Sequence, residues 1–86
     1  MIEKSVVFAS PSGLHARPAS KLSEMVRTFP GDVLLIHEEK TADMKSIINL
    51  IAMGIKKGTR ITIQADGKGE EELIDRIADY ITNLID

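Results

Sequence analysis

The strongest constraint on the fold of this 86-residue chain is that each of its periodic segments has a single apolar face. Residues 60–66, RITIQAD, alternate between apolar and polar side chains, which is typical of a strand buried on one side. Two other segments have apolar residues three or four positions apart, which predicts helices that each bury one stripe. The first of these helices runs from Ala16 to about Thr28, and its apolar stripe consists of Ala19, Leu22, Val26 and Phe29. The other begins at Glu70, and its apolar stripe consists of Leu73, Ile74, Ile77, Ile81 and Leu84.

Turn-forming residues separate four further elements. Runs of β-branched and aromatic residues predict strands at residues 2–9 and 33–37. A shorter, poorly specified strand is expected at residues 40–43. A short helix is expected over residues 47–53, between a good N-cap, Ser46, and a good terminator, Gly54. The predicted fold is a single α+β domain over residues 1–86 in the order β-α-β-β-α-β-α. One sheet with three helices on one face would bury every stripe and leave its other face in water.

The composition excludes several classes of protein. Without cysteine the chain has no disulfide and no thiolate metal site, which fits a cytoplasmic protein. Its two histidines are far apart and lack carboxylates at metal-ligand spacing, so neither a metal nor another cofactor is expected. The net charge of −2, with both signs mixed along the chain, does not favour a nucleic-acid partner. No apolar run is long enough for direct membrane insertion, and the first residues do not resemble a signal peptide.

The stretch GLHARPAS, residues 13–20, places a histidine where a helix begins. Pro18 fits the first turn, so a helix that starts at Ala16 has His15 at its N-cap. The free N–H groups of Ala16 and Arg17 and the positive end of the helix dipole would then lie beside the ring. This environment favours a neutral imidazole, whose unprotonated nitrogen is a nucleophile. If it attacked phosphorus, the same N–H groups and the Arg17 guanidinium would hold the new negative charge.

A simpler interpretation of the same residues is an exposed histidine in a loop and a solvated arginine. The motif lacks the glycine pattern of a phosphate-binding loop, so spacing and chemistry alone favour the simpler interpretation. Lys56 and Lys57 are also most simply solvated residues of a turn, although they could steer an acidic partner.

The short helix has more apolar residues than it can bury. Leu50 and Met53 are expected in the core, while Ile47, Ile48 and Ile51 are expected to be partly exposed near the histidine. An exposed apolar patch beside a reactive group is typical of a docking surface. The alternative, that these isoleucines are ordinary core residues, is equally compatible with the periodicity.

GLHARPAS and KSIINLIAMGIKKG together resemble the HPr family, the histidine-containing phosphocarrier proteins of the bacterial phosphoenolpyruvate:sugar phosphotransferase system. The resemblance covers essentially the whole chain and includes its length, its element order and both motifs. It implies an open-faced β-sandwich, with a four-stranded antiparallel sheet of order 1-4-2-3 and three helices on one face.

The resemblance also implies a function. His15 would accept a phosphoryl group from phosphorylated enzyme I on its Nδ1 atom and pass it to a histidine of a sugar-specific enzyme IIA domain. Arg17 would face the phosphate beside the Ala16 backbone. Such a protein forms a covalent phosphohistidine intermediate but does not turn over alone. It is expected to act as a monomer, because the surface around the histidine must be free for successive partners.

Ser46 has two interpretations. Its N-cap role alone explains a serine at this position. In HPr proteins of low-GC Gram-positive bacteria, the matching serine is phosphorylated by HPr kinase/phosphorylase, and the product is a corepressor for the catabolite control protein. Ile48 and Ile51 stand where that branch commonly has methionine, and Asn49 where it has glycine. These departures leave the partner preference open.

An alternative function is that of an HPr-like regulatory protein, of the catabolite repression or nitrogen-related branch, that acts mainly through protein binding. The catabolite repression relative has glutamine where this chain has His15, which argues against a purely regulatory role. The stretch KLSEM, residues 21–25, faintly resembles the nitrogen-related paralogue.

Overall fold

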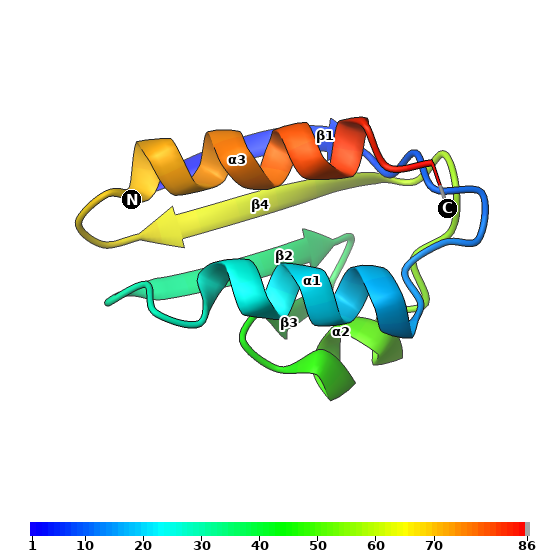
Figure 1. Cartoon of the computed structure of the whole chain (residues 1–86), viewed down its shortest axis with the longest axis horizontal. Helices are drawn as coiled ribbons and strands as arrows, with labels where there is room; N and C mark the ends of the chain where they lie inside the picture. Colours follow the sequence, from blue (N-terminus) through cyan, green and yellow to red (C-terminus); the bar gives the residue numbers. More distant parts are fainter. Residues whose placement is uncertain (86) are drawn as a thin grey trace.

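The chain folds into one four-stranded sheet and three helices, in the predicted order. The computed structural model describes residues 1–85. The elements are β1 (Ile2–Val7), α1 (Ala16–Val26), β2 (Asp32–His37), β3 (Lys40–Asp43), α2 (Ile47–Ala52), β4 (Arg60–Asp66) and α3 (Glu70–Thr82). The sheet order is β1-β4-β2-β3, and every neighbouring pair is antiparallel. This is the open sandwich that the family resemblance implies (Figure 1).

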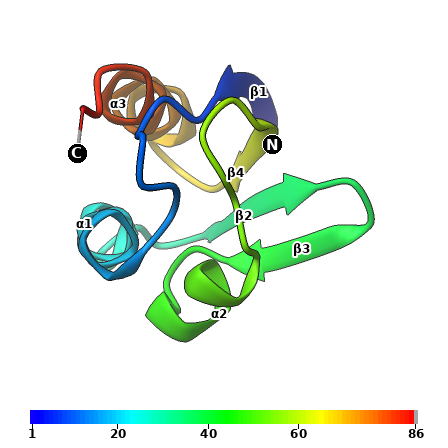
Figure 2. The same ribbon diagram turned by 90° about the vertical axis from the view of Figure 1, so that its right-hand side faces the viewer.

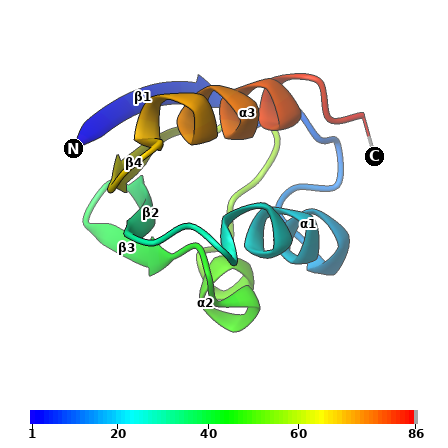
Figure 3. The ribbon, with the colours of Figure 1, turned by 60° about the vertical axis from the view of Figure 1, so that its left-hand side comes forward.

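The helices cover one face of the sheet, as the single-sided stripes predict. α3 packs on β1 and β4, whereas α2 contacts β3 and α1. The end-on view in Figure 2 separates the helices from the strands, and Figure 3 shows α1 and α2 side by side. No helix within the described residues is both long and apolar enough to cross a membrane.

The core lies between the sheet and the helices. In β4 the alternation predicted from RITIQAD is confirmed, because Ile61, Ile63 and Ala65 are buried while Arg60 is exposed. The predicted stripes of α1 and α3 are buried too, except that Leu84 packs half-buried beyond the end of α3. Burying these stripes supplies the main favourable free energy of folding.

β1 is shorter than predicted and ends at Val7 rather than at residue 9. Beyond Val7 the chain pairs with the turn before β4 instead of with β4 itself. The Phe8 N–H donates to the Thr59 carbonyl at 2.9 Å, and the Gly58 N–H donates to the Phe8 carbonyl at 2.8 Å. The turn before β4 is thereby attached to the start of the loop that leads to α1.

α1 also ends earlier than predicted, at Val26 rather than at about Thr28. The Phe29 N–H donates to the Val26 carbonyl at 3.1 Å, three residues back, so the chain tightens after the helix. Phe29 nevertheless remains in the core, as its place in the apolar stripe predicts. The ends of α2 and β2 differ from the predicted ones by a single residue.

Candidate functional site

His15 is the N-cap of α1, as predicted from GLHARPAS. Its backbone is extended, with φ −103° and ψ −168°, and its side chain accepts a hydrogen bond from the first turn of the helix. The Arg17 N–H donates to His15 Nδ1 at 3.5 Å, which is long for such a bond. In this arrangement Nδ1 is the acceptor at the positive end of the helix, and the tautomer of a neutral ring that matches it has its proton on Nε2.

The residues next to His15 in the first turn of α1 are exposed to solvent, and none of that turn is acidic. The His15 residue is half-buried, Ala16 and Arg17 are exposed, and the first turn of α1 contains no carboxylate. A negatively charged group bound to Nδ1 would therefore lie beside the backbone N–H groups of the helix start, and no carboxylate of that turn would repel it.

The loop before His15 is held by the segment that follows α2. The Leu14 N–H donates to the Ile55 carbonyl at 2.9 Å, and the His15 N–H donates to the Gly13 carbonyl at 3.1 Å. Gly13 has a φ of +75°, and a Cβ atom at this position would lie 2.7 Å from the Ile55 oxygen. The close approach and the left-handed backbone both require glycine here.

Ser46 is the N-cap of α2, which confirms the predicted structural role. Its Oγ accepts a hydrogen bond from the Asn49 N–H at 3.2 Å, and its backbone N–H donates to the Asp43 carbonyl at 2.9 Å. The residue is half-buried. Because Oγ is the acceptor in this bond, the hydroxyl hydrogen takes no part in it.

α2 is fixed beside α1 at both of its ends. Near its start, the Ser23 hydroxyl of α1 donates to the Lys45 carbonyl at 3.0 Å. Just beyond its end lies Ile55, whose carbonyl accepts from Leu14. Ser23 is eight residues after His15 along α1, a distance of about 12 Å. The structure therefore places the end of α2 beside the histidine loop and Ser46 beside the middle of α1.

Lys45, just before α2, makes hydrogen bonds both to Ser23 of α1 and to Phe29 beyond the end of α1, and sequence analysis identified neither bond. The Lys45 ammonium donates to the Phe29 carbonyl at 2.9 Å, beyond the end of α1. Ser23 is buried although it is polar, and its hydrogen bond to Lys45 explains why this is tolerated. The only sequence signal was a serine on the apolar side of α1, next to Leu22.

The predicted exposure of the three isoleucines of α2 is confirmed. Ile48 is 79% exposed, Ile51 42% and Ile47 39%, whereas Leu50 of the same helix is fully buried. Met53 is also in the core, as predicted. We call Ile47, Ile48 and Ile51 the α2 patch. It offers apolar surface on an element that packs against α1.

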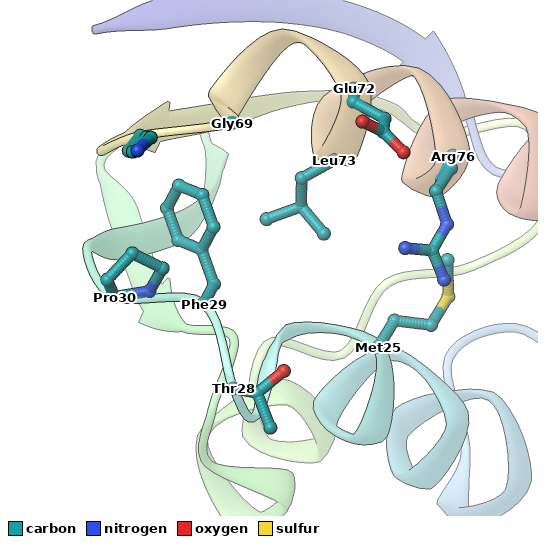
Figure 4. A pocket seen from close by; sticks show the side chains of 9 residues that line it. Met25, Thr28, Phe29, Pro30, Gly69, Glu72, Leu73 and Arg76 are labelled. Carbon is teal, nitrogen blue, oxygen red and sulfur yellow. The ribbon is translucent and has the colours of Figure 1, made fainter.

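A surface pocket lies away from the histidine. It has a volume of about 270 Å³ and is found between the end of α1 and the start of α3, where Met25, Phe29 and Leu73 face one another (Figure 4). It is therefore at the opposite end of α1 from His15. No cluster of three metal-ligating side chains occurs within residues 1–85.

His37, the second histidine, is far less suited to hold a phosphoryl group. It lies at the end of β2, and its Nε2 atom is 3.2 Å from the Glu38 carboxylate. A carboxylate beside the ring would repel a phosphoryl group.

Comparisons with known proteins agree with the fold and identify a family. The family model described as "PTS HPr component phosphorylation site" matches residues 2–83. The phosphocarrier protein HPr of Mycoplasma capricolum is 44% identical over 77 residues, which are 90% of this chain and 86% of that protein. The solved structure of a mycoplasma histidine-containing phosphocarrier protein has a TM-score of 0.85 at 42% identity and covers 91% of this chain and 89% of its own. The crystal structure of phosphocarrier protein HPr from Bacillus anthracis has a TM-score of 0.87 at 31% identity, over 93% and 95% of the two chains.

Proposed function

Since this chain belongs to the HPr family of phosphocarrier proteins, we propose that it carries a phosphoryl group on His15 from phosphorylated enzyme I to sugar-specific enzyme IIA domains. The observation that carries the proposal is the position of Nδ1 at the start of α1, where it accepts a hydrogen bond from the Arg17 backbone nitrogen 3.5 Å away. For this function the chain would be located in the cytoplasm, where it would meet these partners.

The proposed transfer needs little rearrangement. The Nδ1 lone pair attacks phosphorus in line, and the bond from phosphorus to enzyme I breaks as the bond to Nδ1 forms. Nε2 keeps its proton throughout. The long hydrogen bond from the Arg17 N–H is lost, and the same N–H group can then donate to a phosphoryl oxygen. The second transfer, to enzyme IIA, reverses these changes.

The open site suits a carrier better than a deep one would. A phosphate enclosed by several charged side chains would be held too strongly to be passed on. Here the exposed Ala16 and Arg17 backbone and one guanidinium supply moderate stabilisation. A half-buried ring beside the exposed Ala16 and Arg17 also leaves the far side of the phosphorus free for the histidine of the next partner.

We assign the α2 patch to partner docking. Ile47, Ile48 and Ile51 are exposed on an element whose end adjoins the histidine loop. Burying them against a partner would supply apolar contact area beside the reacting atoms. Successive partners would use the same surface, so the chain is expected to act as a monomer.

Ser46 is a candidate for regulatory phosphorylation by HPr kinase/phosphorylase, with a catabolite control protein as the partner of the product. A phosphate at a helix N-terminus is electrostatically tolerable, so the fold should survive the modification. The added charge would lie at the start of the α2 patch. It would weaken docking of enzyme I through desolvation of the phosphate rather than through a change of fold.

The carrier function is tested by incubation with phosphoenolpyruvate and enzyme I. His15→Asn is the informative variant, because asparagine preserves an N-cap acceptor and removes the nucleophile. His37→Asn is its matched control. We expect an acid-labile, base-stable mark on the wild type and on H37N and none on H15N. An unlabelled wild type, with enzyme I active on another HPr, would refute the carrier function.

The alternative is a regulatory protein that acts through Ser46. H15N separates the two functions, since a regulatory protein would retain kinase-dependent labelling and binding in this variant. If the wild type is not labelled by enzyme I, and H15N and the wild type show the same kinase-dependent labelling and partner binding, the regulatory function is the correct one.

A further inference from the structure

The segment between α2 and β4 lies against the loop that carries His15. Besides the hydrogen bond from Leu14 to the Ile55 carbonyl, the Lys56 Cα atom lies only 3.4 Å from where a Cβ of Gly13 would be. Figure 2 shows the two segments side by side, with the loop in blue and the segment after α2 in yellow-green. The backbone of a cationic residue is therefore in contact with the histidine loop.

The position of Lys56 is fixed on both sides. The Thr59 N–H donates to the Lys56 carbonyl at 3.1 Å, which closes a four-residue turn with Lys57 and Gly58 at its centre. Two hydrogen bonds, of 2.8 and 2.9 Å, also attach this turn to Phe8. Lys56 thus stands at the base of the turn, next to the histidine loop, whereas Lys57 stands at its tip.

A phosphoryl group on His15 lies within reach of this lysine. His15 is two residues after Gly13, so its Cα atom is within about 7 Å of the Gly13 Cα. Lys56 is exposed and has a flexible four-carbon stem. Its stem is long enough for the ammonium to reach phosphoryl oxygens on His15 from the segment after α2.

We propose that Lys56 is a second cation of the phosphoryl-binding site, which joins Arg17 when His15 is phosphorylated. The inference rests on the proposed function and adds a residue to its site. A phosphoryl group carries close to two negative charges at neutral pH, more than one guanidinium neutralises. A lysine acts as a mobile point charge, so it can stabilise the phosphate and still release it to a partner.

The test is a ³¹P NMR titration of the phosphorylated chain with Lys56→Gln and two matched controls. Lys57→Gln removes the neighbouring charge at the tip of the turn, and Lys68→Gln removes a charge beside the pocket at the far end of α1. We expect K56Q to reduce the acid dissociation constant of the phosphoryl group about two- to threefold, as for a cation about 7 Å away in water. K57Q should have a smaller effect and K68Q none, and Lys56→Arg should restore the wild-type titration.

The opposite pattern would overturn the inference. If K56Q titrates like the wild type, or if K57Q has the larger effect, Lys56 does not act as a second cation for the phosphate. To keep the outcome independent of enzyme I, the phosphoryl group is also introduced with phosphoramidate in a His37→Asn background. An unlabelled chain with enzyme I would refute the proposed function, whereas labelled chains with unchanged titration would refute only the role of Lys56.

Discussion

At the scale of single residues, the start of α1 explains why a histidine replaces the usual capping residues. Serine, threonine, aspartate and asparagine cap helices well because a short side chain reaches the second or third N–H group. His15 reaches the Arg17 N–H only at 3.5 Å, so it caps weakly and keeps an available lone pair. A histidine at this position stabilises the helix less than a good cap would, but it supplies a nucleophile.

This difference in capping predicts that His15→Asn stabilises the fold while it abolishes phosphorylation. Asparagine is a better cap, so the free energy of unfolding should rise by about 0.5–1 kcal/mol. His15→Ala should instead lower it. Urea denaturation of the wild type and both variants measures the difference. A loss of stability in H15N would show that the ring makes contacts other than the cap.

Gly13 controls the approach of the histidine loop to the segment after α2. In Gly13→Ala the new Cβ would lie 2.7 Å from the Ile55 oxygen and the residue would keep a left-handed backbone, so both strain and a clash are expected. Gly54→Ala is the control, because Gly54 has a φ of +67° but open space around its Cβ position. We expect losses of about 1 kcal/mol in G54A and about 2–4 kcal/mol in G13A. Equal losses in denaturation experiments would mean that the close approach to Ile55 relaxes freely.

At the scale of elements, periodicity predicted which segments are helices and strands, but not where they end. RITIQAD and the stripes of α1 and α3 are long enough for their period to be unambiguous. β1 ends early because Phe8 pairs with Gly58 and Thr59, which are distant in the sequence, so no local pattern contains this end. α1 ends early because the Phe29 N–H bonds to Val26 three residues back, whereas the apolar stripe continues to Phe29 and gives no sign of the tighter turn. Like the end of β1, the link from Lys45 to Phe29 joins residues distant in the sequence and was not predictable.

α2 combines a structural side and an exposed side, and paired substitutions should separate them. Ile48→Ala removes a side chain that is 79% exposed, so stability should change by less than about 0.5 kcal/mol. Leu50→Ala opens a cavity in the core and should cost about 2–5 kcal/mol. Docking predicts that I48A lowers the rate of labelling by enzyme I although its fold is intact. A wild-type rate in I48A, measured with limiting enzyme I, would remove this residue from the docking surface.

At the scale of the whole molecule, the site is assembled from segments that the topology brings to one end of the sheet. The order β1-β4-β2-β3 makes the loop after β1 and the segment before β4 neighbours. The motif GLHARPAS indicates a helix start and a nucleophile on its own. That Ile55 anchors it and that Lys56 lies beside it depend on strand order, which here came from the family resemblance and not from periodicity.

The opposite end of the sheet contains a charged network that should give stability a defined pH dependence. Glu70 accepts the Gly67 N–H at 3.1 Å and pairs with the Met1 ammonium at 2.9 Å. The Gly67 hydrogen bond first, and then the ammonium, lower the pKa of the Glu70 carboxyl below its ordinary 4.5. The hydrogen bond that the Met1 ammonium donates to Glu70 raises the pKa of this ammonium above its ordinary 8.0.

These directions fix the sign of the effect. A depressed carboxyl pKa contributes stability above the unfolded value, which is lost as the pH falls through the folded pKa. A raised amine pKa contributes stability below the unfolded value, which is lost as the pH rises through the folded pKa. Glu70→Gln should therefore lose most stability relative to the wild type between pH 4.5 and 8.0, and less on either side. Urea denaturation across this range, with Glu71→Gln as the control, checks it, and a constant difference at every pH would contradict it.

The most direct test of the central claim is NMR of the phosphorylated chain with ¹⁵N-labelled histidine. Long-range ¹H–¹⁵N spectra distinguish Nδ1 from Nε2 in each ring, before and after treatment with phosphoenolpyruvate and enzyme I. We predict that the phosphoryl group is bonded to Nδ1 of His15, that Nε2 of this ring keeps its proton and that both nitrogens of His37 are unchanged. A phosphoryl group on Nε2 of His15, or on His37, would contradict the nucleophile assigned to the start of α1.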